Sequence, residues 1–365
     1  MSLLLNQPSK VWLRKHTLVR SSPLASSGFS TTLLQSPPCF VAGPDPYGNL
    51  KYDTTIERRS ANRSELELVK KLPVKSVFND AMVVVGSSHG WALNKGDGSL
   101  RLQDDLIPVA SVTDPKRIPL PPFVTLPQCQ TQIITNVSMS SSSPGDEDCV
   151  VAVKFLGPQI SFCRPAHSNS EWINIRISNP CFSSSRVMFS EKHNKFCMPG
   201  SGGHLIGSWY LGKHNDDPKL QTVHFKKLPK LNKAKRKLLH SCYTSEYLVE
   251  SRFTGETFMV KCYKKTAKIV DGIAKMETKA LMVFKLDEEG NAVYNEDIRD
   301  LIMFLSHSEP FCVPASYLPL QIDNSVVAIL DVDELALVNM HEDFFIDNEI
   351  DRKIMSPYFI PPQFI

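Results

Sequence analysis

Short runs of alternating apolar and polar residues recur along most of the chain beyond its first forty residues. Residues 148–164 (DCVVAVKFLGPQISFCR) give the clearest example, because two such runs meet at Gly157-Pro158. A period of two, interrupted by turn-forming residues, predicts a β-hairpin. Similar hairpins are predicted at residues 186–198, 245–263 and 280–298, and further strands at residues 171–177, 204–212 and 324–333.

Helical periodicity is scarce, and the predicted strands are short and fairly evenly spaced. This pattern predicts an all-β fold, either a β-propeller or a large sandwich. We favour a β-propeller-like domain of five to seven blades, since a blade takes about 40–50 residues. The serine-rich stretch 139–148 does not divide the chain, because hairpins of the same kind lie on both sides of it. We therefore expect a single domain over residues 36–365.

The first 35 residues form a separate segment by composition. They contain Lys10, Arg14, Lys15 and Arg20, are rich in serine, and precede the first acidic residue of the chain, Asp45. A basic, acid-free and weakly amphipathic segment, disordered or helical, is typical of an organellar transit peptide. We predict a mitochondrial address for residues 1–35, with the chloroplast as the alternative.

Composition bears on three further questions: binding to polyanions, membrane insertion and disulfide formation. Without the four early basic residues, the chain keeps 37 Lys and Arg against 38 Asp and Glu, so its overall charge does not favour nucleic acid or anionic membranes. No apolar run approaches the roughly 18 residues of a membrane span, which predicts a soluble protein. The nine cysteines include no C-x-x-C pair and are expected to be reduced thiols.

One motif suggests catalysis. Residues 86–90 read Gly-Ser-Ser-His-Gly, the G-x-S-x-G pattern in which a strand-to-helix turn exposes a nucleophilic serine, here Ser88. An alternating run and a Gly-Asp-Gly turn follow at residues 91–98, which predicts a second strand and not a helix. We therefore expect a hairpin corner, with Trp91 buried beneath it and with Ser88→Ala leaving folding nearly unchanged.

The same region carries a family resemblance. Residues 83–105 (VVVGSSHGWALNKGDGSLRLQDD), followed by residues 114–122 (DPKRIPLPP), resemble the opening of the plant domain of unknown function 295 family. Further similar stretches are CVVAVKF (149–155), ISFCRP (160–165), EWINI (171–175), LVES (248–251), LMVFKLDEEG (281–290) and SEPFCVPAS (308–316). The similarity runs from about residue 75 to about residue 330. With the basic leader, the chain most resembles the organellar branch of that family.

The resemblance implies a KIB-type β-propeller with no known enzymatic activity. Members of the family often carry an N-terminal F-box, which recruits a ubiquitin ligase. No F-box helix pattern precedes Val83 in this sequence, so we do not expect a ubiquitin-ligase adaptor.

The strongest charge anomaly lies in residues 225–240 (FKKLPKLNKAKRKLLH). No acidic residue occurs between Lys219 and Ser245. A contact with nucleic-acid phosphates or with anionic lipid is one interpretation. A solvated, partly helical loop between blades is the other, because no aromatic residues alternate with the lysines. The candidate contact residues are Lys226, Lys227, Lys230, Lys233, Lys235, Arg236 and Lys237.

Other candidate sites are weaker. His193, Cys197, His204, His214 and His224 lie close in sequence but lack zinc-like spacing. The glycine-rich stretch 199–209 fits no phosphate-binding motif and predicts a turn between strands. Asp331 and Asp333 share a strand face, where acidic decoration of an exposed strand is the simpler interpretation than a divalent ion. We expect no metal and no cofactor.

These observations predict a non-catalytic interaction scaffold of plant mitochondria, with an unidentified protein partner. The alternative is a hydrolase that uses Ser88, or a metal-dependent enzyme that uses Asp331 and Asp333. The element that follows Ser88 separates the two: a helix favours the enzyme, and a strand favours the scaffold.

Overall fold

The structure is a computed structural model of the 365-residue chain. It describes residues 38–42, 54–59, 66–72, 83–96, 98–210, 218–270, 273–317, 326–331, 334–339 and 358–362. The chain divides into two compact units, residues 1–34 and 35–365, and all described residues belong to the second. The predicted targeting segment 1–35 lies outside the described residues.

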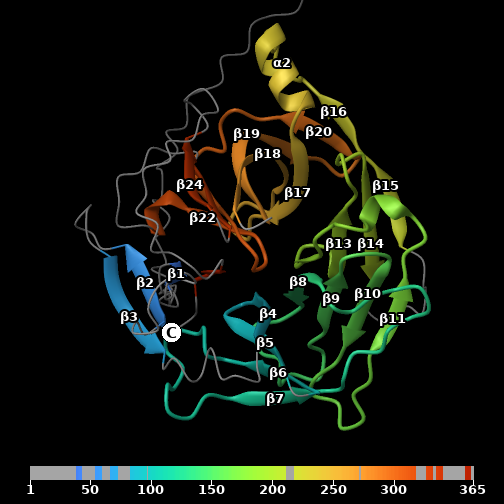
Figure 1. Cartoon of the computed structure of the whole chain (residues 1–365), viewed down its shortest axis with the longest axis vertical. Coiled ribbons are helices and arrows are strands. Elements are labelled where there is room, and N and C mark those ends of the chain that lie inside the picture. Colours follow the sequence, from blue (N-terminus) through green and yellow to red (C-terminus); the bar gives the residue numbers. More distant parts are fainter. Residues whose placement is uncertain are drawn as a thin grey trace, which may run out of the picture. The chain divides into compact units, whose positions relative to one another are not determined.

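Within these residues the strands form six sheets around a common centre, and we number the sheets as blades in chain order (Figure 1). Blade 1 holds β25 (Phe359–Ile360), β1 (Cys39–Ala42), β2 (Thr54–Arg59) and β3 (Leu66–Leu72). Blade 2 holds β4 (Val83–Ser88), β5 (Trp91–Gly96), β6 (Ser99–Gln103) and β7 (Arg117–Leu120). Blade 3 holds β8 (Ile134–Met139), β9 (Val151–Phe155), β10 (Gln159–Cys163) and β11 (Ile173–Arg176).

The remaining blades follow in the same way. Blade 4 holds β12 (Met188–Ser190), β13 (Lys195–Pro199), β14 (Leu205–Tyr210) and β15 (Lys219–Thr222). Blade 5 holds β17 (Tyr243–Glu250), β18 (Thr257–Val270), β19 (Ile273–Leu286), β20 (Asn291–Tyr294) and β16 (His224–Lys226). Blade 6 holds β22 (Phe311–Pro314), β21 (Leu301–Leu305), β23 (Val326–Asp331) and β24 (Glu334–Asn339). Helix α2 (Lys233–His240) connects β16 and β17, the two outer members of the blade 5 strand order, and short 3-10 turns occupy Pro180–Phe182 and Ala315–Tyr317.

Blade 1 closes the ring of sheets. Its inner strand β25 comes from the end of the chain and pairs with β1, in the register Cys39 to Ile360 and Phe40 to Phe359. One sheet is thus built from both ends of the domain, which is a usual way to close a propeller and leaves only short sheet edges.

The apolar cores lie between neighbouring blades. One cluster joins Leu93 and Leu102 of blade 2 to Val137 and Val153 of blade 3, and another joins Ile160 of blade 3 to residues of blade 4. Because each sheet buries both faces against its neighbours, a strand such as β9 is buried along its whole length. The predicted all-β, propeller-like fold is confirmed, and six sheets fall within the predicted range of blades.

The predicted hairpin at residues 148–164 is confirmed as β9 and β10, and the predicted strand at 204–212 contains β14. One element exceeds the prediction. The hairpins predicted at residues 245–263 and 280–298 correspond to β17–β18 and β19–β20. In addition, β18 and β19 pair with each other through residues 264–279 as far as Val270 and Ile273, which makes a longer hairpin between them.

Candidate functional site

The G-x-S-x-G stretch is a tight hairpin corner. Strand β4 ends at Ser88, β5 begins at Trp91, and these two residues pair across the ladder. His89 and Gly90 form the turn with φ angles of 50° and 81°, the left-handed values that a two-residue hairpin turn requires. A strand therefore follows Ser88, as predicted. Trp91 is buried, also as predicted, and its indole N–H donates to the carbonyl of Ser142 at 3.0 Å.

Gly86, the first glycine of the motif, is required by close packing and not by the turn. A Cβ atom at this position would lie 2.4 Å from Cγ2 of Val137 on β8, so a side chain here would force the first strands of blades 2 and 3 apart. The first glycine of the motif thus serves the close approach of two inner strands, and the second serves the turn.

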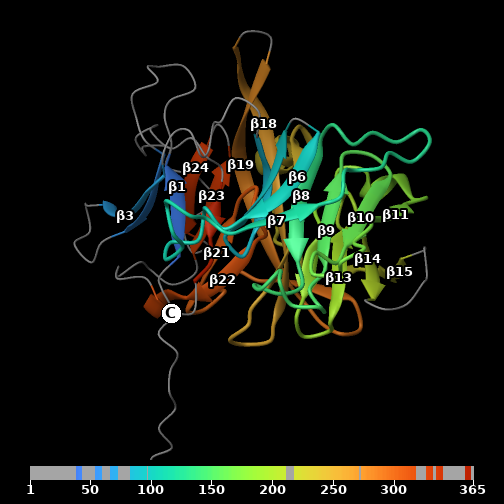
Figure 2. The ribbon, with the colours of Figure 1, turned by 90° about the horizontal axis from the view of Figure 1, so that it is seen from below.

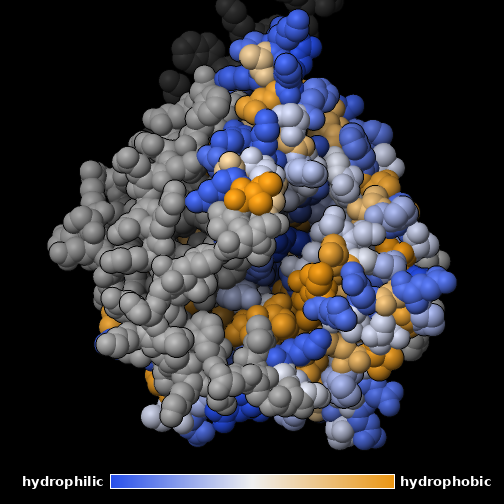
Figure 3. Space-filling view, in the orientation of Figure 1, coloured by the Kyte–Doolittle hydropathy of each residue, from blue (hydrophilic) through white to orange (hydrophobic). Residues whose placement is uncertain are grey.

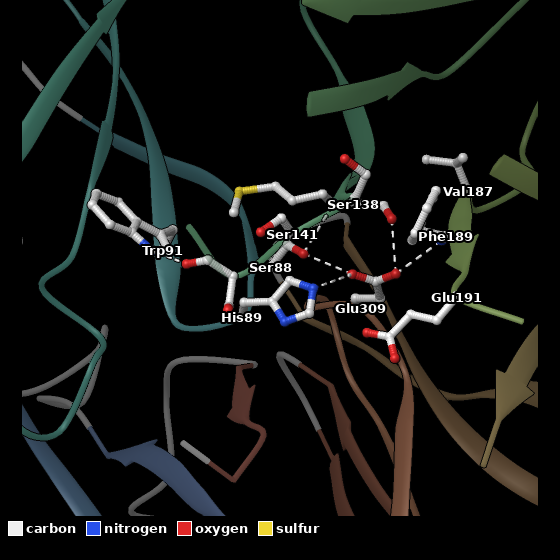
Figure 4. A network of polar contacts seen from close by, with 12 residues as sticks. Ser88, His89, Trp91, Ser138, Ser141, Val187, Phe189, Glu191 and Glu309 are labelled. Atoms are coloured by element: carbon white, nitrogen blue, oxygen red, sulfur yellow. Dashed lines mark hydrogen bonds and ion pairs between the residues drawn. The ribbon is translucent and has the colours of Figure 1, made fainter. Parts of the chain in front are cut away.

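The hydroxyl of Ser88 takes part in a buried network around Glu309 (Figure 4). It donates to Oε2 of Glu309 at 2.6 Å and accepts the backbone N–H of Met139 at 3.1 Å. Only 1% of Ser88 is exposed. A nucleophile must reach its substrate, so this geometry does not support Ser88 as the nucleophile of a hydrolase.

Glu309 joins the ends of several inner strands. Its Oε1 accepts the Ser138 hydroxyl of β8 at 2.8 Å and the Phe189 N–H of β12 at 3.0 Å. Beside it, the Ser308 hydroxyl donates to the carbonyl of Phe359 on β25 at 2.8 Å. Burial raises the pKa of Glu309, against the lowering effect of the donors from Ser88, Phe189 and Ser138.

His89 lies next to this carboxylate, with Nε2 4.0 Å from Oε2 of Glu309. Burial, and after it the positive charge of Arg252, lower the pKa of His89 to about 4. The imidazole is therefore neutral at pH 7 and does not neutralise the carboxylate.

Glu309, together with its neighbours His89 and Ser308, lines a cavity of about 1250 Å³. We call this cavity the mouth. The inner strand of every one of the six described blades contributes to its wall or leads into it: β25 through Pro361, β4 through His89, β8 through Met139, β12 through Phe189, β17 through Glu250 and β22 through Phe311. The mouth thus lies where the six inner strands converge.

The mouth is acidic. Six carboxylates line it, against two arginines and the neutral His89; the carboxylates are Asp146, Glu147, Asp148, Glu191, Glu250 and Glu309. Two of them pair with the arginines, Arg252 with Glu191 at 2.5 Å and Arg164 with Asp148 at 3.8 Å. Apolar side chains lie among the charges, including Phe253, which is 44% exposed. The combination suits a ligand that carries positive charge together with apolar groups.

The predicted basic segment lies elsewhere. Helix α2 begins after Asn232, whose side chain accepts the N–H of Lys235 at 2.8 Å, and Leu231 and Leu239 pack against the blade 4–5 core. The segment is partly helical, as the second interpretation expected, but it joins β16 and β17 of blade 5 and does not connect two blades. Six of its seven cations are exposed and Lys235 is half-buried; the exposed ones are Lys226, Lys227, Lys230, Lys233, Arg236 and Lys237. The mouth and α2 lie at opposite ends of β17, since Glu250 lines the mouth and α2 precedes Tyr243.

The other sequence candidates do not assemble into a site in the described part of the chain. No group of three His, Cys, Asp or Glu residues there is placed to hold a metal ion. His193 lies 3.8 Å from Glu288, His204 stacks edge-on against Phe225, and Cys197 is buried beside Ser208. His214, Asp333 and the side chain of Asp331 lie outside the described residues. No disulfide joins the nine cysteines, six of which are buried.

Glu309, Glu191 and Arg252 line the mouth but were not predicted as site residues from the sequence. The one available signal was the family resemblance, since residues 86–91 and 308–316 both belong to stretches that carry it. Nothing in the spacing of residues 88 and 309 indicates that they meet.

Six sheets around a common centre, closed by pairing between the chain ends, define a β-propeller. The family model described as the KIB1-4 beta-propeller matches residues 64–348, and the chain belongs to this family. β-Propellers in general mediate protein interactions. In the described residues, no helix is long and apolar enough to cross a membrane.

No curated protein matches the chain. Among solved structures, Hsv2 of Kluyveromyces lactis is 8% identical with a TM-score of 0.32, covering 69% of this chain and 72% of its own. A protein from Lactobacillus plantarum is 9% identical with a TM-score of 0.40, covering 91% of this chain and 100% of its own. Similarities this weak support no argument about function.

Proposed function

We propose that this protein is a non-catalytic interaction scaffold of plant mitochondria, and that it binds a basic segment of a partner protein in the mouth. The acidic lining of the mouth carries the proposal. The family supports a propeller scaffold, the resemblance to the organellar branch of the plant domain of unknown function 295 family supports a plant origin, and the acid-free segment 1–35 supports the address.

The charges of the mouth favour a cationic ligand for a physical reason. Asp146 and Glu147 are exposed at its rim, while Glu309 lies at its floor with 14% of its side chain exposed. A hollow lined by charges of one sign concentrates their field and attracts the opposite charge. A lysine or arginine that enters and contacts one of these carboxylates at about 4 Å would gain about 4 kcal/mol before desolvation costs.

The apolar part of the lining favours a protein segment over a simple ion. Phe189, Phe253 and Phe311 lie among the charged groups. Aromatic side chains in a concave site supply contact area at low cost in conformational entropy, and they are frequent anchors of protein interfaces. A short segment with alternating basic and apolar side chains would satisfy both parts of the lining.

Site-directed photo-crosslinking tests this function. A photoreactive phenylalanine analogue replaces Phe253 in the mouth or, as a control of similar exposure, Leu220 on β15. We expect the probe at Phe253 to capture a distinct partner in plant mitochondria, and the probe at Leu220 not to capture it.

A second pair of variants tests the role of charge. Asp146→Asn with Glu147→Gln neutralises the rim, and Asp114→Asn with Glu171→Gln neutralises two exposed acids elsewhere. Crosslinking of the partner by the probe at Phe253 should be lost in the Asp146→Asn, Glu147→Gln variant and at high salt. It should persist in the Asp114→Asn, Glu171→Gln control. Equal capture from Phe253 and Leu220, capture that ignores both the rim charges and salt, or labelling of Ser88 by a fluorophosphonate would contradict the proposal.

A further inference from the structure

Blade 5 extends beyond the other sheets at the end away from the mouth. Strand β17 pairs with β18 only as far as Tyr243 and Lys264, whereas β18 and β19 continue together to Val270 and Ile273. Six further residues at about 3.3 Å each make a two-stranded extension of about 20 Å. Figure 2 shows this hairpin projecting from the body.

The two most exposed large apolar side chains among the described residues lie at the base of this extension and near its end. Tyr243 at its base is 72% exposed, and Ile269 near its end is 70% exposed. Isolated exposed apolar residues are common, but Ile269 lies on the projecting hairpin together with exposed Lys265 and Lys268, and Tyr243 of β17 lies at its base. Residues 264–275 contain four lysines and a single acid, Asp271.

The basic segment adjoins the base of the extension. Helix α2 ends at His240, and Tyr243 begins β17 and pairs with Lys264. Figure 3 shows hydrophilic side chains gathered over α2. The exposed cations of this segment (Lys226, Lys227, Lys230, Lys233, Arg236 and Lys237) form no ion pair with any described residue, so their charge is available to a partner.

We propose that this end of blade 5 binds the surface of an anionic lipid bilayer. Ile269 enters the boundary between headgroups and acyl chains, Lys265 and Lys268 contact lipid phosphates, and the cations of α2 add long-range attraction. Stable attachment of a peripheral protein needs both an apolar insertion and basic charge, and this surface supplies both. The amphipathic ring of Tyr243 also suits a membrane–water interface.

A nucleic acid would match the cations but leave Ile269 unexplained. Binding to single strands uses aromatic platforms for the bases, and Tyr243 is a single ring at the base of a lysine-rich hairpin. An exposed isoleucine gains nothing from a phosphate backbone, whereas its burial in an apolar environment is favourable. Exposed Ile269 therefore favours an anionic membrane over a nucleic acid as the ligand of this surface.

The test is flotation of the full chain with vesicles of phosphatidylcholine alone and of phosphatidylcholine with cardiolipin, and its binding to a single-stranded RNA. We expect salt-sensitive binding to the cardiolipin vesicles only. Lys265→Gln with Lys268→Gln should weaken vesicle binding about 25-fold, because each lysine near such a surface contributes about fivefold. Ile269→Asp should weaken it at least as much. Neutralising Lys233, Arg236 and Lys237 to Gln should weaken it further.

Matched controls separate these effects from general changes of surface. Ile173→Asp alters an isoleucine that is 56% exposed on β11, and Lys116→Gln with Lys219→Gln removes two exposed charges elsewhere. Both controls should bind like the wild type. Absence of binding to cardiolipin vesicles, undiminished binding of Ile269→Asp, or tighter binding to RNA than to vesicles would each overturn the proposal. None of these variants touches the mouth, so the outcome is independent of the proposed function.

Discussion

The side chains of Ser88 and Glu309 are 221 positions apart in the chain and joined by a hydrogen bond of 2.6 Å. The bond links the end of the first strand of blade 2 to the residues that precede β22 of blade 6. Since Glu309 also accepts Ser138 and the Phe189 N–H, one carboxylate ties four blades together beneath the mouth. Ser88 of the G-x-S-x-G motif is thus part of the hydrogen-bond network that connects the blades, and it is not positioned as a nucleophile.

Ser88→Ala is therefore expected to destabilise the fold, contrary to the expectation from sequence alone. It removes one donor to Glu309 and leaves the buried N–H of Met139 without its acceptor. Leaving a buried polar group unsatisfied costs about 1–3 kcal/mol. Chemical denaturation measures the loss, with Ser99→Ala as a control, because the Ser99 hydroxyl makes an exposed bond to Gly96. Equal stability of the two variants would show that the network contributes nothing.

His89 should make stability depend on pH in the acid range. Its pKa is about 4 in the folded protein, against an ordinary value of 6.5, so the unfolded chain binds more protons between these values. Stability from this group is then full above pH 6.5 and falls as the pH drops toward 4, by up to about 3 kcal/mol. His89→Gln should flatten this part of the pH profile, whereas His224→Gln, at an exposed position, should not. An unchanged profile in His89→Gln would disprove the assignment.

Lys154 should make the stability of the fold depend on pH in the alkaline range. It is fully buried on β9, and Nζ donates to the carbonyls of Phe155, Gly157 and Ser183, the last two at 2.8 and 3.0 Å. Burial lowers its pKa to about 7 from an ordinary 10.5. The unfolded chain therefore binds more protons between pH 7 and 10.5, and stability should rise across this range.

Lys154→Met serves as the test of that effect. The variant leaves three carbonyls without their donor, at a net cost of about 1–3 kcal/mol. Its stability should lack the rise between pH 7 and 10.5, so its deficit against the wild type should widen with pH. Lys116→Gln, at an exposed position, should follow the wild type. A deficit that stays constant with pH would mean that Lys154 keeps an ordinary pKa.

The features that sequence predicted are local ones. The β9–β10 hairpin follows from alternation and a Gly-Pro turn, and the corner at Ser88 follows from the strand pattern after Gly90. The length of the β18–β19 hairpin could not be predicted from the sequence pattern. Its lysine-rich outer part is exposed, so no buried face imposes an alternation of apolar and polar residues there. The mouth could not be predicted at all, since Glu309 and Glu191 reach it only when the ring of sheets closes.

The two proposed surfaces would let one molecule join a membrane to a partner. The mouth receives Glu250 from one end of β17, and the membrane-binding extension begins at Tyr243, at its other end. An eight-residue strand spans roughly 25 Å, so a propeller attached through blade 5 would present its acidic mouth away from the bilayer. This arrangement fits a scaffold that holds a basic partner segment near an anionic membrane.

The address of the protein is the last prediction, and it concerns residues 1–35. This stretch carries four basic residues and no acid, and a membrane potential that is negative inside draws each positive charge inward with about 2.3 kcal/mol per 100 mV. Residues 1–35 fused to a fluorescent protein should therefore enter plant mitochondria. Changing Lys10, Arg14, Lys15 and Arg20 to Gln should leave the fusion in the cytosol, whereas changing the same number of serines to Ala should not. Fluorescence confined to chloroplasts, or import that survives the loss of all four charges, would refute the mitochondrial address.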